Sequence, residues 1–237
     1  MSFSINRVYA IFQKDVKELA KNLMVLSTII MPLFFALLFG REDPVVLEIH
    51  YLIINLTLVS VAAFVQCAII AEEKEKNTLR GLMMSPASVV EILTGKSLVS
   101  IILTGVTFWV CINITGYQPE NWGVISTALI ISLIFYLALG TLLGLVTRTL
   151  MEASVVIVPF ILVFGMGVLF TELMGDLALL EILEYLPNIQ LEQLAATVEN
   201  GGGFAEVGSE LAIISGWTLI TLVAVQVVYQ KRKVDGM

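Results

Sequence analysis

The stretch Thr94-Gly95-Lys96-Ser97 has the residue types that close a phosphate-binding loop, which makes it the first candidate for nucleotide chemistry in this sequence. A complete loop of this type needs a second glycine five residues before Gly95, because successive backbone N–H groups must wrap the phosphates. Position 90 is Val90, and no strand pattern precedes it. We therefore predict a helix here, with Lys96 reaching toward the membrane interface, and no ATP site on this chain.

The rest of the sequence offers no catalytic or metal-binding set. His50 is the single histidine, so a zinc site of the usual His and Cys spacing is not expected, and a serine hydrolase using His50 as its base would lack the Gly-x-Ser-x-Gly motif. The long apolar runs contain no Asp, Glu, Lys, Arg or His, the groups on which proton relays depend. We predict that the chain is not an enzyme and has no catalytic, metal or cofactor-binding residues.

The elements that hold these residues are predicted to be membrane-spanning helices. The chain is 58% hydrophobic and 14% charged, against about 45–50% and about 25% for soluble domains, and its net charge of −7 argues against a nucleic-acid partner. A span needs roughly 20 apolar residues, with about 17 as the lower limit. Six runs qualify: Leu23–Phe39, Tyr51–Ala71, Ser97–Ile114, Val124–Thr147, Ala153–Leu169 and Leu211–Tyr229. We predict an all-α integral membrane protein with a six-helix transmembrane domain over residues 23–229.

The basic residues predict which way these spans run. With the N-terminus in the cytoplasm, 12 of the 13 Lys and Arg residues fall on the inner side and only Arg41 falls outside. This is the distribution that the positive-inside rule describes. We predict a multi-pass protein of the cell membrane with both termini cytoplasmic, ending in a basic tail over residues 230–237.

Three segments lie outside the predicted spans. Residues 1–22 have a basic amphipathic pattern, which predicts a helix that lies on the inner leaflet or packs on other protein; its apolar residues are Ile5, Val8, Tyr9, Phe12, Val16 and Leu19. Ser88 and Glu91 form a capping-box pattern that should start the third helix at Val89. The external segment 170–210 predicts a pair of short helices, the first over Leu177–Leu186 and the second capped by Asn188.

The cytoplasmic segment 72–88 carries the most specific pattern. It begins with the charge run Glu72-Glu73-Lys74-Glu75-Lys76, and such a run is usually only a solvated segment. This run continues into Thr78, Leu79, Leu82, Met83 and Met84, however, which place apolar groups on a cytoplasmic surface. An apolar patch bordered by charge is typical of a docking site.

At these residues the sequence resembles the membrane subunits of type 2 ABC (ATP-binding-cassette) transporters, the ABC exporter family. They carry the pattern Glu-x-Glu-x-Gly-Thr-Leu-Glu-x-Leu, then Thr-Pro, then Glu-Ile-Leu-x-Gly-Lys, between spans two and three. The matching residues are 73–82, Ser85-Pro86 and 91–96, with Asn77 in place of glycine, Arg80 in place of glutamate and Ser85 in place of threonine. The amphipathic first helix, the six spans and the short external helix pair before the last span agree, so the resemblance covers nearly the whole chain.

The resemblance implies a permease subunit of an ATP-driven exporter. Segment 72–88 would be the coupling loop that contacts a separate ABC ATPase subunit, which would bind the ATP and Mg, and two permease subunits would form a homodimer or heterodimer around the substrate route. The predicted coupling residues are Glu72, Glu73, Glu75, Thr78, Leu79, Leu82, Met83, Ser85 and Pro86. Gly140 and Gly144, four residues apart, allow close helix approach within or between subunits.

Two polar residues of the second run are candidates for the route. Asn55 and Gln66 fall on one helix face, where they could line the route or form hydrogen bonds between helices of one subunit. Twelve predicted external carboxylates would favour a cationic amphiphile if they line the route, and the alternative is that they reflect the acidic proteome of a salty habitat. The predicted substrate class is an amphipathic or hydrophobic drug, antibiotic, peptide or lipid-like compound. The alternative function is an ATP-independent secondary carrier or a membrane scaffold subunit, and a Na⁺ site made of carbonyl and hydroxyl oxygens would suit the carrier.

Overall fold

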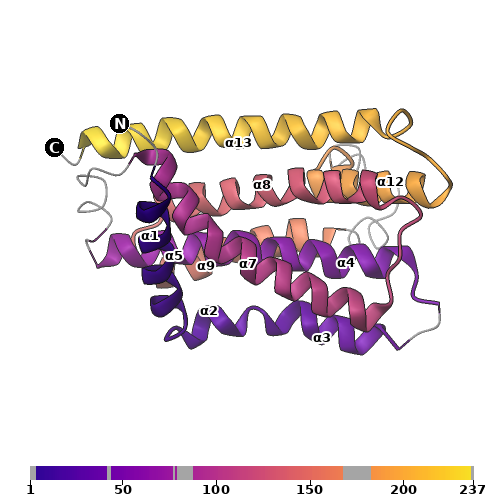
Figure 1. The fold of residues 1–237 in the computed structure, drawn as a ribbon, viewed down its shortest axis with the longest axis horizontal. Helices are drawn as coiled ribbons and strands as arrows, with labels where there is room; N and C mark the ends of the chain where they lie inside the picture. Colours follow the sequence, from indigo (N-terminus) through magenta and orange to yellow (C-terminus); the bar gives the residue numbers. More distant parts are fainter. Residues whose placement is uncertain (1–3, 42–43, 77, 79–87, 168–182, 236–237) are drawn as a thin grey trace.

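A computed structural model describes residues 4–41, 44–76, 78, 88–167 and 183–235, and in these residues all regular secondary structure is helical (Figure 1). The predicted all-α fold is therefore confirmed. The helices are α1 Ile5–Leu19, α2 Leu23–Ser27, α3 Ile30–Phe39, α4 Leu47–Thr57, η1 Leu58–Ala63, α5 Phe64–Glu75, α7 Val89–Thr115, α8 Trp122–Val146, α9 Leu150–Phe160, η2 Ile161–Gly165, α12 Pro187–Glu199 and α13 Gly208–Asp235.

Four continuous helices in the described part of the chain are long and apolar enough to cross a membrane. They are Leu47–Glu75, Val90–Thr115, Trp122–Val146 and Gly208–Lys231. The first predicted run reaches that length only together with α1, from which it is bent by 82°, and the described part of the fifth run is the shorter helix Leu150–Gly165. Several membrane-spanning helices are thus present, while the count of six complete spans stays a prediction.

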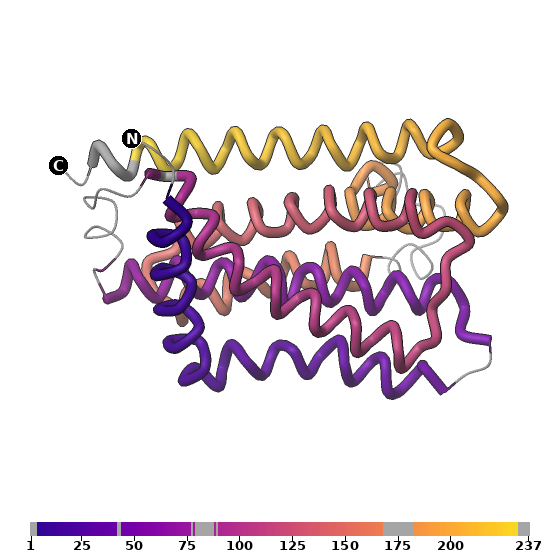
Figure 2. Tube along the Cα trace, in the orientation of Figure 1, coloured from indigo at the N-terminus to yellow at the C-terminus, as the bar shows by residue number. Residues whose placement is uncertain are grey.

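The second run forms the centre of the bundle. The helix Leu47–Glu75 is completely buried over its most apolar 18 residues, whereas the corresponding share of Gly208–Lys231 is 22%. Figure 2 shows α13 along one side of the bundle, next to α8 and α12, while α1 crosses the ends of the long helices. The central helix is therefore surrounded by protein, and the last helix presents most of its apolar surface outward.

Two segments of π-helix lie inside this bundle, η1 in the central helix and η2 after α9, and they contact each other. Gly140 and Gly144 of α8 pack on the central helix of the same chain: a Cβ at Gly144 would lie 2.8 Å from the Cys67 carbonyl oxygen. The glycine spacing noted in the sequence therefore serves packing within one subunit.

The helix ends agree with the sequence at one place and differ at another. The predicted capping box is present: Glu91 N donates to Ser88 Oγ at 3.2 Å, Ser88 N donates to Glu91 Oε2 at 2.6 Å, and α7 begins at Val89. Asn188, in contrast, does not cap the second external helix. The N-cap of α12 is Leu186 with Pro187 in the first turn, and Asn188 is a buried residue within the helix. Most of the predicted helix Leu177–Leu186 lies outside the described residues.

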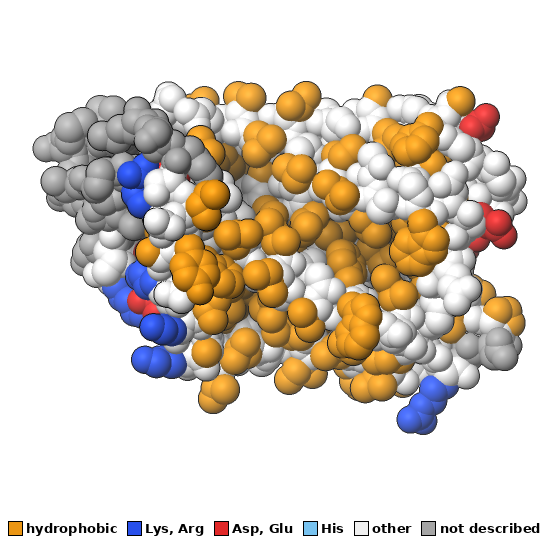
Figure 3. Space-filling view, in the orientation of Figure 1, with side chains coloured by type: hydrophobic (Ala, Val, Ile, Leu, Met, Phe, Trp, Pro, Cys, Tyr) orange, Lys and Arg blue, Asp and Glu red, His pale blue; other side chains and the backbone are white. Residues whose placement is uncertain are grey.

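Charges gather at the two ends of the molecule and apolar side chains cover the side between them (Figure 3). Most of the Lys and Arg visible in that view are at the end where α1 crosses the bundle, and the Asp and Glu at the far end lie near α12. We call the first the basic end and the second the acidic end. This separation is the pattern expected of a protein that spans a membrane.

Candidate functional site

The predicted coupling residues that the structure describes lie at the basic end, where the central helix finishes. Glu72, Glu73 and Glu75 occupy the last turn of α5, and Thr78 Oγ1 donates to the Glu73 carbonyl oxygen at 3.2 Å. The remaining predicted residues lie outside the described part of the chain, so their role in coupling stays a prediction; they are Leu79, Leu82, Met83, Ser85 and Pro86.

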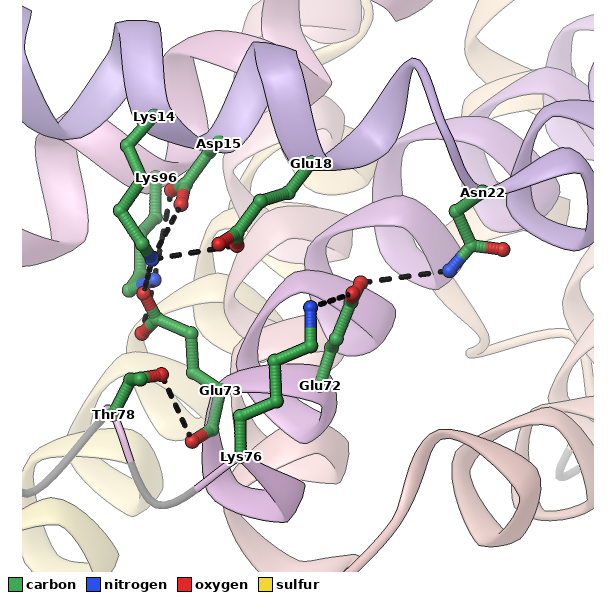
Figure 4. A network of polar contacts seen from close by, with 9 residues as sticks. All are labelled: Lys14, Asp15, Glu18, Asn22, Glu72, Glu73, Lys76, Thr78 and Lys96. Atoms are coloured by element: carbon green, nitrogen blue, oxygen red, sulfur yellow. Dashed lines mark hydrogen bonds and ion pairs between the residues drawn. The ribbon is translucent and has the colours of Figure 1, made fainter.

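Glu73 joins three helices through ion pairs (Figure 4). Its carboxylate accepts a hydrogen bond from Lys14 of α1 and lies 2.5 Å from Lys96 Nζ of α7. Lys96 Nζ is also 3.5 Å from Asp15 Oδ2 of α1. Asp15, Glu73 and Lys96 are each at most 1% exposed, and removing one partner of such a buried pair typically costs about 3–5 kcal/mol.

The prediction that Lys96 extends to the membrane interface is therefore wrong. Lys96 is completely buried, because α1 and α5 bring two carboxylates to it from distant parts of the sequence. The ammonium group of Lys96 is neutralised inside the protein and does not have to reach water.

The neighbours of Glu73 bind other helices. Glu72 accepts hydrogen bonds from Asn22 Nδ2 at the start of α2 and from Lys76 Nζ. Lys74 Nζ donates to the carbonyl oxygens of Leu145 and Thr147 at the end of α8, the first at 2.6 Å. Glu75 Oε2 accepts from the Leu150 backbone N at 2.9 Å. We call Glu72–Glu75 the charged turn.

Each member of the charged turn is thus bound to an element distant in the sequence. Together they contact α1, α2, α7, α8 and the first residue of α9. The common interpretation of such a run as a merely solvated segment does not apply to these four residues. They connect the root of the predicted coupling loop to five other helices.

The other side of the loop is fastened to α1 as well. Arg7 Nη2 donates to Glu91 Oε1 at 2.7 Å, and Ser4 N donates to the same oxygen at 2.5 Å. Gly95 allows the two helices to touch, since a Cβ there would lie 2.9 Å from the Ile11 Cβ and 3.0 Å from the Val8 carbonyl oxygen. Both helices that flank segment 76–88 therefore rest on α1.

The buried stripe of α1 differs in part from the predicted apolar face. Val8, Ile11, Asp15 and Leu19 are buried, while Ile5 and Tyr9 are 76% and 56% exposed. A charged residue occupies the buried stripe because its partner Lys96 is supplied by α7. Packing on protein, one of the two predicted surroundings of this helix, is confirmed for the buried stripe.

The local electrostatics favour the charged form of Lys14 and disfavour that of Asp15. Burial works against the charge of Lys14, but the hydrogen bond and the field of Glu73 outweigh it and raise the pKa of Lys14. Burial raises the pKa of Asp15, and Glu73 acts in the same direction, whereas Lys96 opposes the shift. The charge of Asp15 therefore depends on Lys96 staying beside it.

The two candidate route residues lie inside the subunit. Gln66 is completely buried; its Nε2 donates to Thr141 Oγ1 at 3.1 Å and its Oε1 accepts from Ser100 Oγ at 3.1 Å. Asn55 is also buried, and its Nδ2 donates to the Asn188 carbonyl oxygen at 3.4 Å. Both residues thus form hydrogen bonds between helices of one subunit, which was one of the two roles that the sequence allowed. A role of Asn55 and Gln66 in the substrate route stays a prediction.

The sequence interpretation missed Asp15 and Lys74. Asp15 could have been found, because a carboxylate at the spacing of Val8, Ile11 and Leu19 interrupts a helix face that otherwise reads as apolar. Lys74 gave no comparable signal, since the end of α8 that it binds is more than 70 residues away.

Comparison with known proteins agrees with this architecture. A search of curated proteins gives no match to the chain. Residues 45–227 match the family described as ABC-2 family transporter protein, a range that includes the charged turn, Glu91 and Lys96 and begins after α1. Because the match covers most of the chain, the protein belongs to the ABC-2 family and is the membrane subunit of an ABC transporter.

Proposed function

We propose that this chain is the permease subunit of an ATP-driven exporter and that segment 72–88 couples it to a separate ABC ATPase subunit. The observation that carries the proposal is the charged turn, which binds α1, α2, α7, α8 and the first residue of α9 at the root of that segment. A movement imposed on the segment would reach those helices directly. ATP and Mg belong to the partner, and a second permease subunit, as a homodimer or heterodimer, completes the route.

The direction of insertion follows from the charges. In this proposal the basic end faces the cytoplasm and the acidic end faces outward. Six spans of the cell membrane with both termini cytoplasmic would then bring the coupling segment next to a soluble ATPase. The buried ion pairs at the root of the segment support the coupling assignment, because breaking such a pair is costly and the segment is therefore firmly attached to its helices.

The substrate is proposed to be an amphipathic or hydrophobic compound with a positive charge, such as a drug, an antibiotic or a peptide. The acidic end supports this class, since its carboxylates attract cations as they leave or approach. Glu48, Glu120, Glu199 and Glu206 are exposed there. Changing these four to Gln should reduce transport of a fluorescent cationic dye in vesicles and spare that of a neutral lipid analogue. Equal transport of the dye by both forms would refute the charge preference.

The coupling assignment is tested by placing carboxylates on the predicted docking surface. Leu79→Asp with Leu82→Asp would bring charge into an apolar interface, at a cost of several kcal/mol unless the subunits separate. We expect the double variant to lose co-purification with the ATPase subunit and to lose ATP-dependent transport. Lys21→Met, at an exposed position of the basic end, is the matched control and should retain both.

The outcomes separate the alternatives. A variant that binds the ATPase and transports at the wild-type rate would show that the coupling assignment is wrong. A wild-type chain that transports with no ATPase subunit present would instead identify an ATP-independent carrier. Binding without transport would support the proposal and assign Leu79 and Leu82 to force transmission.

A further inference from the structure

Asp15, Glu73 and Lys96 form a buried triad, and only Glu73 of the three is one of the predicted coupling residues. One member comes from each of α1, α5 and α7, and Lys96 Nζ lies between the two carboxylates at 3.5 Å from Asp15 and 2.5 Å from Glu73. Lys14 binds the outer side of Glu73. All three triad side chains are withdrawn from water, so none can leave its partners without stranding a buried charge.

This triad makes relative movement of the three helices difficult. Sliding α1 along α7 would separate Asp15 from Lys96 while both remain buried. The close approach at Gly95 adds a steric limit, because Ile11 and the Val8 backbone already touch that glycine. The pair of Arg7 with Glu91 is a further point of attachment nearer the start of both helices. Charge and packing therefore restrain the same motion.

The far end of α1 leads into the first predicted span. Asn22 receives the chain after α1, accepts a hydrogen bond from Val25 N at 3.3 Å as the cap of α2, and donates to Glu72 of the charged turn. The two parts of this corner are bent by 82°. A rotation of α1 is thus passed to α2 and α3 through a short, hydrogen-bonded corner.

We infer that the triad locks α1 to both helices that flank the coupling segment, so that α1, the end of α5 and the start of α7 move as one body and carry the first span with them. Asp15, Glu73 and Lys96 are then positioning residues for coupling, although α1 precedes the region that matches the family. This inference rests on the proposed function, because it assigns the body that the ATPase would move.

The test measures distances between spin labels in the reconstituted complex of full-length subunits, without nucleotide and after trapping with ATP and vanadate. The labels are attached to cysteines that replace exposed residues in two pairs. One pair is Lys17 on α1 with Val90 on α7, and the other is Lys17 with Lys231 on α13. The native Cys67 and Cys111 are buried and remain unlabelled. We expect the distance from 17 to 90 to change by less than about 2 Å, the scale of small helix shifts, and the distance from 17 to 231 to change by more.

Variants of the triad then test whether its ion pairs are what keeps the 17-to-90 distance constant. Asp15→Asn with Lys96→Met removes two opposite charges together and leaves Glu73 paired with Lys14. We expect this double variant to assemble with the ATPase subunit, to broaden the 17-to-90 distance distribution and to lose most of the nucleotide-dependent change from 17 to 231. Lys96→Arg, made alone in the wild-type protein, keeps the charge and should retain a narrow 17-to-90 distance distribution. Lys21→Met is the control.

A 17-to-90 distance that changes as much as the 17-to-231 distance would overturn the inference. So would a double variant whose distributions match those of the wild type. Failure of the proposed function is a separate result, because it would appear as a wild-type chain that binds no ABC ATPase.

Discussion

Gly140 of α8 lies directly against the carbonyl of Ala63 in η1, so that a Cβ at Gly140 would overlap the Ala63 carbonyl oxygen. The two helices meet where the central helix widens into a π-helix. Such a widening displaces backbone carbonyls from their regular positions, and the missing side chain of Gly140 provides the room for one of them.

Gly140→Ala should therefore destabilise the protein. Overpacking of this kind typically costs about 1–3 kcal/mol, which outweighs the gain of about 1 kcal/mol that alanine brings to an ordinary helix position. Gly105→Ala is the matched control, since nothing lies within 4 Å of a Cβ at Gly105. Thermal unfolding of both variants in detergent, followed by circular dichroism, measures the effect, and equal midpoints would contradict it.

Lys74→Met should loosen the end of α8. Lys74 Nζ binds carbonyl oxygens of the last turn of that helix, and a cation at a helix C-terminus contributes about 0.3–2 kcal/mol depending on burial. We expect faster hydrogen exchange at residues 143–147 and no change in α7. Lys76→Met, which breaks only the exposed pair with Glu72, should leave exchange in α8 unaltered; an effect as large as that of Lys74→Met would argue against the assignment.

Gln66 offers a way to separate packing from transport. A double-mutant cycle of Gln66→Leu and Thr141→Val should give a coupling energy near 0.6 kcal/mol and below about 1.7 kcal/mol, the range for hydrogen bonds between membrane helices. If Gln66 also lines the route, Gln66→Leu combined with Asn55→Leu will reduce transport while the subunits still assemble. A loss of transport no larger than the loss of stable, assembled protein would assign both residues to packing.

The stability of the protein should depend on pH through Glu199, which lies at the acidic end. Partial burial and the charge of the neighbouring Glu120 raise the pKa of Glu199 above its ordinary value of 4.5, against the opposing effect of hydrogen bonds from the Glu120 backbone and Tyr117. A raised folded-state pKa means that its contribution to stability is complete below about pH 4.5 and is lost as pH rises through the folded-state value. Glu199→Gln should therefore raise the unfolding midpoint at pH 7 and change it little at pH 4. A lower midpoint at pH 7 would contradict this sign.

Features set by neighbours in the sequence were predicted well. Ser88 and Glu91 are three residues apart, and the capping box needs only these two side chains and their own backbone. The long helices likewise follow from uninterrupted apolar runs, because the bilayer requires backbone groups to bond within the segment. The resemblance to the family could also be inferred from three short stretches between residues 73 and 96, and the family match over residues 45–227 includes them.

Features set by distant residues could not be predicted in the same way. Lys96 belongs to a helix whose own sequence gives it no partner, and only the approach of Asp15 and Glu73 makes its burial possible. The π-helix η1 has an apolar sequence that is equally suited to a regular helix, and it packs on Gly140, which lies about 80 residues further along the chain. For the same reason the charge run at Glu72 could not be distinguished from a solvated segment.

The bend of 82° between α1 and the first predicted span has a mechanical consequence. A helix of 15 residues is about 22 Å long, so a rotation of about 10° about this corner displaces the other end of α1 by about 4 Å. Because the two segments meet at nearly a right angle, that displacement of α1 rotates the helix joined to it about the helix's own axis. The bend at the basic end thus allows a sideways displacement of α1 to become a rotation of α2 and α3 about their own axis.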